Sequence, residues 1–295
     1  MDIYQTITDK IVGLIEAGAG KWRMPWHSRE AGAIMARPHN PLSGTRYRGI
    51  NVALLWAAAE AKGYTSHAWA TYNQWQAAGA QVRKGERSEL VFFWKRVAVA
   101  EGEDDDGEAG EDTRKYRFIA RAYNVFAAEQ VDGWEPVGEP AAAPEGLAET
   151  LRIGMADGFF RAVGAKIEHG GNRACYIPAA DMIRMPQFAD FDEPVAYYAT
   201  LGHEHVHWTG AEGRCAREFG KRFGDAAYAF EELVAELGAA FLCAELGLAN
   251  EPRPDHAAYI DTWLDVLRRD KRAIFTAGGK AQAAVEFLVA AAAGG

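Results

Sequence analysis

The sequence has few cysteines and no long apolar run. Its three cysteines, Cys175, Cys215 and Cys243, are odd in number and widely spaced, which argues against a disulfide framework and against a thiolate zinc site of the Cys-x-x-Cys kind. No stretch approaches the roughly 18 apolar residues of a membrane-spanning helix, and the first residues lack the basic and apolar regions of a secretory signal. We therefore expect a cytoplasmic protein without a membrane partner.

Basic residues are outnumbered overall, but not in the first third of the chain. The net charge of −9 would on its own argue against a nucleic-acid partner. Residues 1–100 nevertheless hold 13 Lys and Arg against 7 Asp and Glu, whereas residues 101–112 hold 8 acidic residues and no basic one. A basic front and an acidic back are typical of two domains with different partners.

The length of 295 residues, with 49% hydrophobic and 25% charged, also fits two soluble globular domains. A stretch rich in Pro, Ala and Gly interrupts the sequence at residues 134–146. We place the domain boundary there. Residues 1–133 are predicted to form an α+β domain with a β-hairpin, residues 134–146 a linker and residues 147–295 a mainly helical domain, so the fold class is α+β.

The spacing of apolar residues predicts the individual elements. In the front half, residues 1–133, this spacing indicates helices over residues 2–17, 51–62 and 69–79. It also indicates strands over 90–99 and 116–126, which pair across the acidic tip 101–112. In the second strand, Arg117, Ile119, Arg121 and Tyr123 share one face, which would form a mixed basic and aromatic platform. In the back half, residues 147–295, the spacing indicates strands over 174–177 and 181–185, and helices over 147–163, 193–208, 226–246, 257–269 and 279–292.

The strongest chemical signal is the pattern His-Glu-x-x-His at residues 203–207. On a helix, His203 and His207 lie four residues apart and aim two imidazoles at one point, while Glu204 reaches a water bound there. Two imidazoles and one carboxylate would leave a tetrahedral Zn²⁺ an open position, where the pKa of water falls to about 7. Mn²⁺ or another divalent ion is the alternative. Glu204 is the predicted catalytic base.

A third ligand is expected from the next predicted helix. Glu232 and Glu236, four residues apart, lie at the edge of its apolar stripe, where a half-buried carboxylate costs several kcal/mol unless something compensates it. If Glu232 binds the metal and Glu236 accepts the N–H of a ligating histidine, the burial cost of both carboxylates is compensated. Glu231 and Glu236 are the alternative ligands. The competing interpretation is a pair of surface histidines beside a solvated acidic face.

Aromatic and basic residues interleave in the loops of the front half. This combination suits sequence-tolerant binding of single-stranded DNA, in which each stacked base contributes about 1 to 3 kcal/mol. The competing interpretation is that the tryptophans, Trp56 and Trp75 among them, belong to the core. The predicted DNA-binding residues are Lys21, Trp22, Arg23, Trp26, Arg46, Tyr47, Arg48, Lys84 and Arg87.

The sequence also resembles a known family. The similarity is carried in front by Lys-Trp-Arg-Met-Pro-Trp at residues 21–26 and by residues 47–51, 71–74, 82–86 and 123–126, and behind by residues 203–210, 222–224, 231–241 and 263–275. These segments resemble the ArdC-type antirestriction proteins of conjugative plasmids, whose N-terminal domain also occurs on conjugal primases. The resemblance implies a domain that binds single-stranded DNA, a zincin-like metallopeptidase domain, and protection of incoming plasmid DNA from restriction.

A more distant resemblance concerns residues 232–236 alone. Glu232-Leu-Val-Ala-Glu236 is similar to the Glu-x-x-Ala-Asp helix that supplies the third zinc ligand in some membrane metallopeptidases, with Glu236 in place of the aspartate.

Three functions follow as hypotheses. In the first, a metallopeptidase of the His-Glu-x-x-His plus Glu type is delivered to DNA, and residues 173–185 offer an edge strand to an extended peptide of a restriction enzyme or another protein substrate. In the second, the protein protects by coating DNA or occluding the restriction enzyme, and the metal only stabilises the fold. A metal-dependent nuclease is less favoured, because such sites usually hold two metals about 4 Å apart.

Overall fold

A computed structural model describes residues 2–19, 24, 26–27, 35–98, 116–135, 149–219, 226–250 and 257–294. Several predictions fall outside these ranges. They are the acidic tip 101–112, most of the linker 134–146, and the residues Lys21, Trp22 and Arg23.

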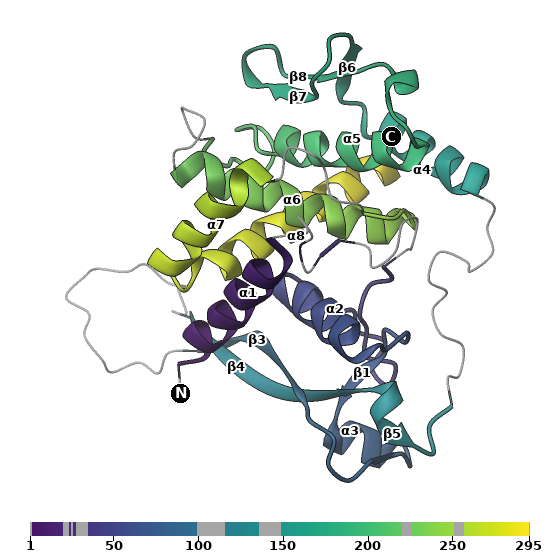
Figure 1. Cartoon of the computed structure of the whole chain (residues 1–295), viewed down its shortest axis with the longest axis vertical. Coiled ribbons are helices and arrows are strands. Elements are labelled where there is room, and N and C mark those ends of the chain that lie inside the picture. Colours follow the sequence, from purple (N-terminus) through teal and green to yellow (C-terminus); the bar gives the residue numbers. More distant parts are fainter. Residues whose placement is uncertain are drawn as a thin grey trace, which may run out of the picture.

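The two long helices of the front half connect it to the back half, α1 through α7 and α2 through α8. Helix α1 (Ile3–Ala19) buries Ile7, Ile11 and Ile15, which the four-residue spacing places on one face. Helix α2 (Ile50–Lys62) contacts β3 on one side and α8 on the other (Figure 1). The buried Asn51 amide pairs with the backbone N–H and C=O of Phe92 at 3.0 and 2.7 Å, so α2 is fixed to the sheet without an unsatisfied polar group.

The main sheet has the order β1-β4-β3 and is antiparallel throughout. The predicted hairpin is confirmed, with β3 at Glu89–Ala98 and β4 at Tyr116–Ala127. A separate pair, β2 (Gln81–Val82) and β5 (Val131–Asp132), lies at its end.

The helix predicted over residues 69–79 is wrong at its start. Residues Trp69–Thr71 form β1, which pairs with the end of β4, and helix α3 covers only Tyr72–Ala77. The reason is a capping box: Thr71 accepts the backbone N–H of Gln74, whose side chain reaches back to the N–H of Thr71.

The back half is a helical assembly with a small sheet on one side (Figure 1). Its helices are α4 (Glu149–Val163), α5 (Pro194–Thr209), α6 (Ala226–Leu246), α7 (Ala257–Arg269) and α8 (Ala273–Gly294). The sheet has the order β6-β8-β7, from β6 (Lys166–His169), β7 (Cys175–Ile177) and β8 (Met182–Met185). Strand β6 was not predicted, because most of its side chains are polar and exposed.

Helix α8 starts six residues before its predicted start at residue 279. Gly278 and Gly279 both lie inside the helix. Gly278 is there because α2 passes too close for a side chain: a Cβ at this position would lie 2.7 Å from the backbone nitrogen of Ile50.

The two halves share one apolar core. Trp56 of α2 contacts Phe241 of α6 with ring centroids 6.1 Å apart, and Phe92 of β3 lies 4.6 Å from Phe275 of α8. The α+β class and the two-part architecture are thus confirmed, while the predicted boundary at residues 134–146 stays a prediction. No helix in the described ranges combines the length and apolarity needed to cross a membrane.

Candidate functional site

The site lies where α5 and α6 approach each other closely. Residues 201–209 of α5 are all buried, which is unusual for a segment with three histidines and a glutamate. Gly238 of α6 allows this approach, because a Cβ there would lie 2.7 Å from the Val206 side chain. The short distance between the helix axes brings His203 and His207 of α5 opposite Glu232 of α6.

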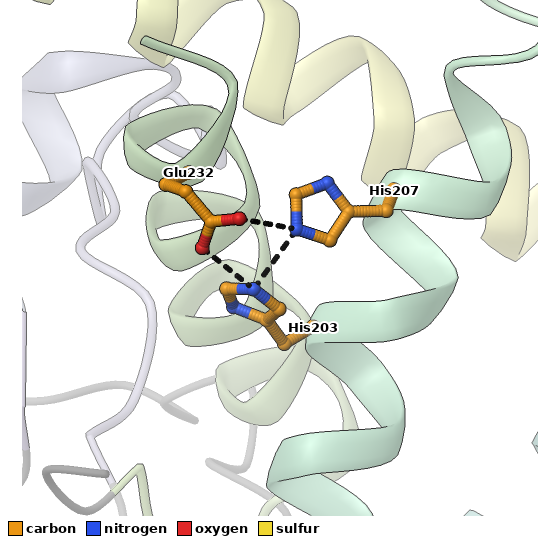
Figure 2. Close-up of side chains that lie close together, drawn as sticks. All are labelled: His203, His207 and Glu232. Atoms are coloured by element: carbon orange, nitrogen blue, oxygen red, sulfur yellow. Dashed lines mark hydrogen bonds and ion pairs between the residues drawn. The ribbon is translucent and has the colours of Figure 1, made fainter. Parts of the chain in front are cut away.

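The three side chains point at one centre (Figure 2). The two Nε2 atoms of His203 and His207 are 3.0 Å apart, and the Glu232 carboxylate oxygens lie 3.5 Å from the first and 3.4 Å from the second. Metal bonds of 2.0 to 2.1 Å in a tetrahedron separate neighbouring ligand atoms by about 3.3 Å. The observed distances therefore match one face of such a tetrahedron.

The protonation pattern also fits a cation. Nδ1 of His207 lies 3.2 Å from a Glu231 oxygen, so it carries the proton and leaves the Nε2 lone pair facing His203. Two imidazole lone pairs 3.0 Å apart repel each other unless a proton or metal ion lies between them. Burial lowers the pKa of His207, but Glu232 and Glu231 outweigh it and raise the pKa to about 10, so without a metal a proton occupies Nε2, and a metal ion would replace that proton. The donor set suits a divalent ion.

Glu231, one of the alternative ligands, faces the back of His207 instead. Arg217 binds its carboxylate through Nε at 3.0 Å and through Nη2 at 2.8 Å. Burial raises the pKa of Glu231, but His207 and Arg217 outweigh this effect and lower it. A carboxylate fixed in this way orients the His207 ring and increases its basicity. No sequence motif includes Arg217, so its role could not be predicted.

Glu236 occupies the corresponding place behind His203. One of its oxygens lies 3.5 Å from Nδ1 of His203, and the other lies 3.0 Å from Nε2 of His27. The backbone N–H of Met24 donates to Nδ1 of His27 at 3.0 Å, so the neutral His27 ring carries its proton on Nε2 and donates it to Glu236. No sequence signal pointed to His27, because its partner Glu236 lies 209 positions further along the chain.

Glu204 lines the open side of the site. A cavity of about 250 Å³ is bounded by His203, Glu204, His207 and Glu232 together with residues of β7, the segment before it, and α6 and α7. The backbone N–H of Tyr176 donates to a Glu204 oxygen at 2.8 Å and so holds this carboxylate in the cavity. Because β7 pairs only with β8 within its sheet, it is an edge strand beside the site, in the region where one was predicted.

Two tyrosines complete the cavity wall. The Tyr228 hydroxyl lies 3.3 Å from that of Tyr259. Burial, together with hydrogen bonds to Tyr259 and Glu232, raises the pKa of Tyr228 well above its usual range. The hydroxyl therefore stays protonated and can donate a hydrogen bond. Tyr228 lies in no sequence motif, so the sequence alone did not indicate it as a hydrogen-bond donor to the cavity.

The predicted DNA-binding residues separate into three groups. Arg46, Arg48, Lys84 and Arg87 are exposed, although Arg46 pairs with Glu245 at 2.8 Å and Arg48 with Glu286. Lys21, Trp22 and Arg23 lie outside the described residues.

For Trp26 and Tyr47 the prediction needs correction, because neither presents a free ring face to a base. Trp26 is 0% exposed and packs against Trp263, while Tyr47 is 3% exposed and donates its hydroxyl to the Trp69 carbonyl at 3.0 Å. Here the core interpretation of the aromatics is correct.

Comparison with known proteins matches each half to a family. Residues 1–126 match the N-terminal domain of anti-restriction factor ArdC, and residues 154–280 match a family of zincin-like metallopeptidases. The antirestriction ArdC protein of plasmid R388, solved metal-free and with Mn(II), is 38% identical, with a TM-score of 0.77. The metal-free comparison covers 100% of this chain and 99% of that one. The chain belongs to the ArdC antirestriction family.

Two further relatives extend the comparison. The ArdC-family chain is 48% identical to the uncharacterized protein y4eC of Sinorhizobium fredii, over 97% of this chain and 91% of y4eC. The chain is also 34% identical to DNA primase TraC of Escherichia coli over 97% of its own length. It spans only 20% of the length of that primase.

Proposed function

We propose that this ArdC-family chain protects incoming plasmid DNA from restriction by binding single-stranded DNA and by acting as a metallopeptidase at the α5–α6 site. One observation carries the enzymatic part: His203, His207 and Glu232 converge from two helices, and Glu204 lines the same cavity. Zn²⁺ is the proposed ion, with Mn²⁺ as the alternative. The R388 relative was solved with Mn(II).

The residues that line the cavity have separate roles in the proposed peptide hydrolysis. A divalent ion held by His203, His207 and Glu232 supplies Lewis-acid chemistry, which polarises a carbonyl and acidifies water. Glu204 removes a proton from the attacking water and delivers it to the leaving amine. Its carboxylate is already oriented by the Tyr176 N–H. The Tyr228 hydroxyl stabilises the oxyanion that develops on the substrate.

The substrate would bind along β7. Residues 173–176 line the cavity, and β7 is an edge strand. An extended peptide can add to such an edge through main-chain hydrogen bonds. This geometry favours a protein substrate, for which a restriction enzyme of the recipient cell is the proposed candidate, over a nucleic-acid backbone.

The decisive experiment compares wild type with Glu204→Gln. Glutamine keeps the acceptor for the Tyr176 N–H but cannot take a proton, so the variant should fold, bind metal and bind DNA normally. We expect it to lose proteolysis and to fail to protect transferred DNA in a restricting recipient cell. Proteolysis that survives this substitution would disprove the peptidase assignment.

The second candidate function is protection by binding alone, with the metal as a structural element. It is favoured by the position of the site, since His27 of the front half supports Glu236 of the back half and a bound metal would strengthen their union. Under this function Glu204→Gln keeps full protection. Charge reversal of Arg23, Arg48 and Arg87 together abolishes protection and reduces the salt dependence of DNA binding.

A further inference from the structure

An open groove of about 720 Å³ lies in the front half, far in sequence from the metal-site residues. Its volume falls within the range of about 300 to 1,000 Å³ that is usual for ligand sites. Four stretches line it: residues of the loop 40–47, residues 71–74 at the start of α3, Phe93 of β3, and residues 122–125 of β4.

Aromatic rings stand open in this groove. Tyr72, Phe93 and Tyr123 are 41%, 41% and 40% exposed, which is high for large apolar side chains. Phe93 and Tyr123 meet edge to face with centroids 5.6 Å apart, and the buried Tyr47 ring lies 6.1 Å beneath Phe93. Tyr123 and the exposed Arg121 lie on the strand face predicted to form a basic and aromatic platform.

The floor of the groove is held by hydrogen bonds. Asn40 donates to the Gln74 side chain at 3.0 Å and accepts the N–H groups of Leu42 and Ser43. Gln74 in turn caps α3 through Thr71. A ligand would therefore meet a preformed surface and lose little free energy in ordering it.

The polar groups of the groove suit nucleobases. Among the described residues that line it none is acidic, although the chain contains 41 Asp and Glu. The amides of Asn73 and Asn124 are exposed at the groove, where they can donate to and accept from the edges of bases. Unstacked bases combine exposed ring faces with such edges.

Cations lie where the phosphates would run. Thr45 and Arg46 line both the groove and an adjoining hollow of about 500 Å³, which also contains Arg37 and Arg48. Glu245 pairs with Arg37 and Arg46, and Glu286 pairs with Arg48. A phosphate backbone can replace the carboxylate partner of the exposed Arg46 and Arg48.

We propose that this groove is the base-binding subsite for single-stranded DNA, in which bases stack on Phe93 and Tyr123 and the backbone passes Arg46. The proposal deepens the DNA-binding part of the proposed function and rests on it. In a duplex the bases stack on one another, so their faces cannot reach these rings. The groove therefore selects single strands.

The test measures the affinity of the full-length protein for a fluorescent oligothymidine and for an abasic oligomer of equal length. Wild type should bind the oligothymidine more tightly. The double variant Phe93→Ala/Tyr123→Ala should weaken its affinity for the oligothymidine about 5- to 150-fold for each base it no longer stacks. The affinity for the abasic strand and the slope of affinity against salt should stay unchanged. Phe188→Ala, at an exposed ring of the back half, is the control.

A second variant avoids truncation of the sheet. Asn124→Asp keeps the side-chain size but puts a carboxylate into the groove, so it should weaken binding of both strands. If wild type binds the oligothymidine and both variants stay within twofold of it, the groove is not the subsite. If wild type binds no single strand, the DNA-binding function itself fails.

Discussion

The metal site and the aromatic groove are built in opposite ways. At the first, His203, His207 and Glu232 are buried, and their charged or polar atoms face each other. At the second, Phe93 and Tyr123 leave about two fifths of their surface open, and no described lining residue is acidic. One site offers two imidazoles and a carboxylate to a small cation, whereas the other presents ring faces and amides to a larger ligand.

The two sites also differ in what supports them. The groove is formed by the front half, while the metal site takes His27 from the front half and the remaining groups from the back half. Perturbing the groove should therefore leave the metal site intact. Perturbing the contact between the halves should affect the metal site first.

The largest effect is expected at the third ligand. Glu232→Gln keeps the size of the side chain but removes its charge, so metal affinity should fall by well over 100-fold, more than outer-shell changes usually cause. Competition with a chromophoric chelator measures this affinity. Glu245→Gln, on the same helix but paired with Arg37 and Arg46, is the control. Equal losses in both variants would contradict the ligand assignment.

A smaller loss of metal affinity is expected when the hydrogen bond from His27 of the front half to Glu236 of the back half is removed. His27→Ala removes the donor to Glu236, whose other oxygen lies 3.5 Å from His203. Metal affinity should fall about 10- to 100-fold. His27→Gln, whose amide N–H can replace the Nε2 donor, should restore part of it. Groove-dependent DNA affinity should not change in either variant, and neither should metal affinity in the control His169→Ala.

The convergence of His203, His207 and Glu232 was far more predictable from sequence than the residues that support them. The helices over 226–246 and 257–269 match the predicted ranges, because their apolar spacing is regular. Glu232 was identifiable, since an acidic residue at an apolar edge needs a partner. The choice among Glu231, Glu232 and Glu236 depends instead on how α6 is rotated against α5. That rotation is set by packing, such as the contact of Gly238 with Val206.

The groove was less predictable because exposure is a tertiary property. Trp26 lies next to basic residues in the sequence, as a stacking residue would, yet it is buried against Trp263. Phe93 lies in a strand among apolar residues, as a core residue would, yet it is open. Only the strand register and the position of the loop 40–47 decide which ring faces solvent.

The union of the halves can be tested at two adjacent glycines. Gly278→Ala places a Cβ 2.7 Å from the Ile50 backbone nitrogen, so α2 and α8 must separate. We expect the free energy of unfolding to fall by about 1 to 3 kcal/mol. Gly279→Ala meets no described atom within 4 Å and should be neutral, or stabilising by up to about 1 kcal/mol. Urea denaturation measures both, and equal stabilities would contradict this packing.

Acid should weaken the region next to the groove through His67, whose carbonyl accepts the N–H of His39 beside the groove residue Asn40. Burial and the neighbouring His39 lower the pKa of His67 to about 4, whereas carboxylates raise that of His207. A histidine with a lowered folded-state pKa contributes full stability above the unfolded pKa of about 6.5 and loses it as pH falls toward 4. His67 should contribute about 1.4 kcal/mol to the loss of stability at pH 5.5. Urea denaturation at pH 8 and 5.5 should show this loss of stability in wild type and a smaller loss in His67→Gln. Equal losses in the two proteins would mean that other groups cause the acid sensitivity.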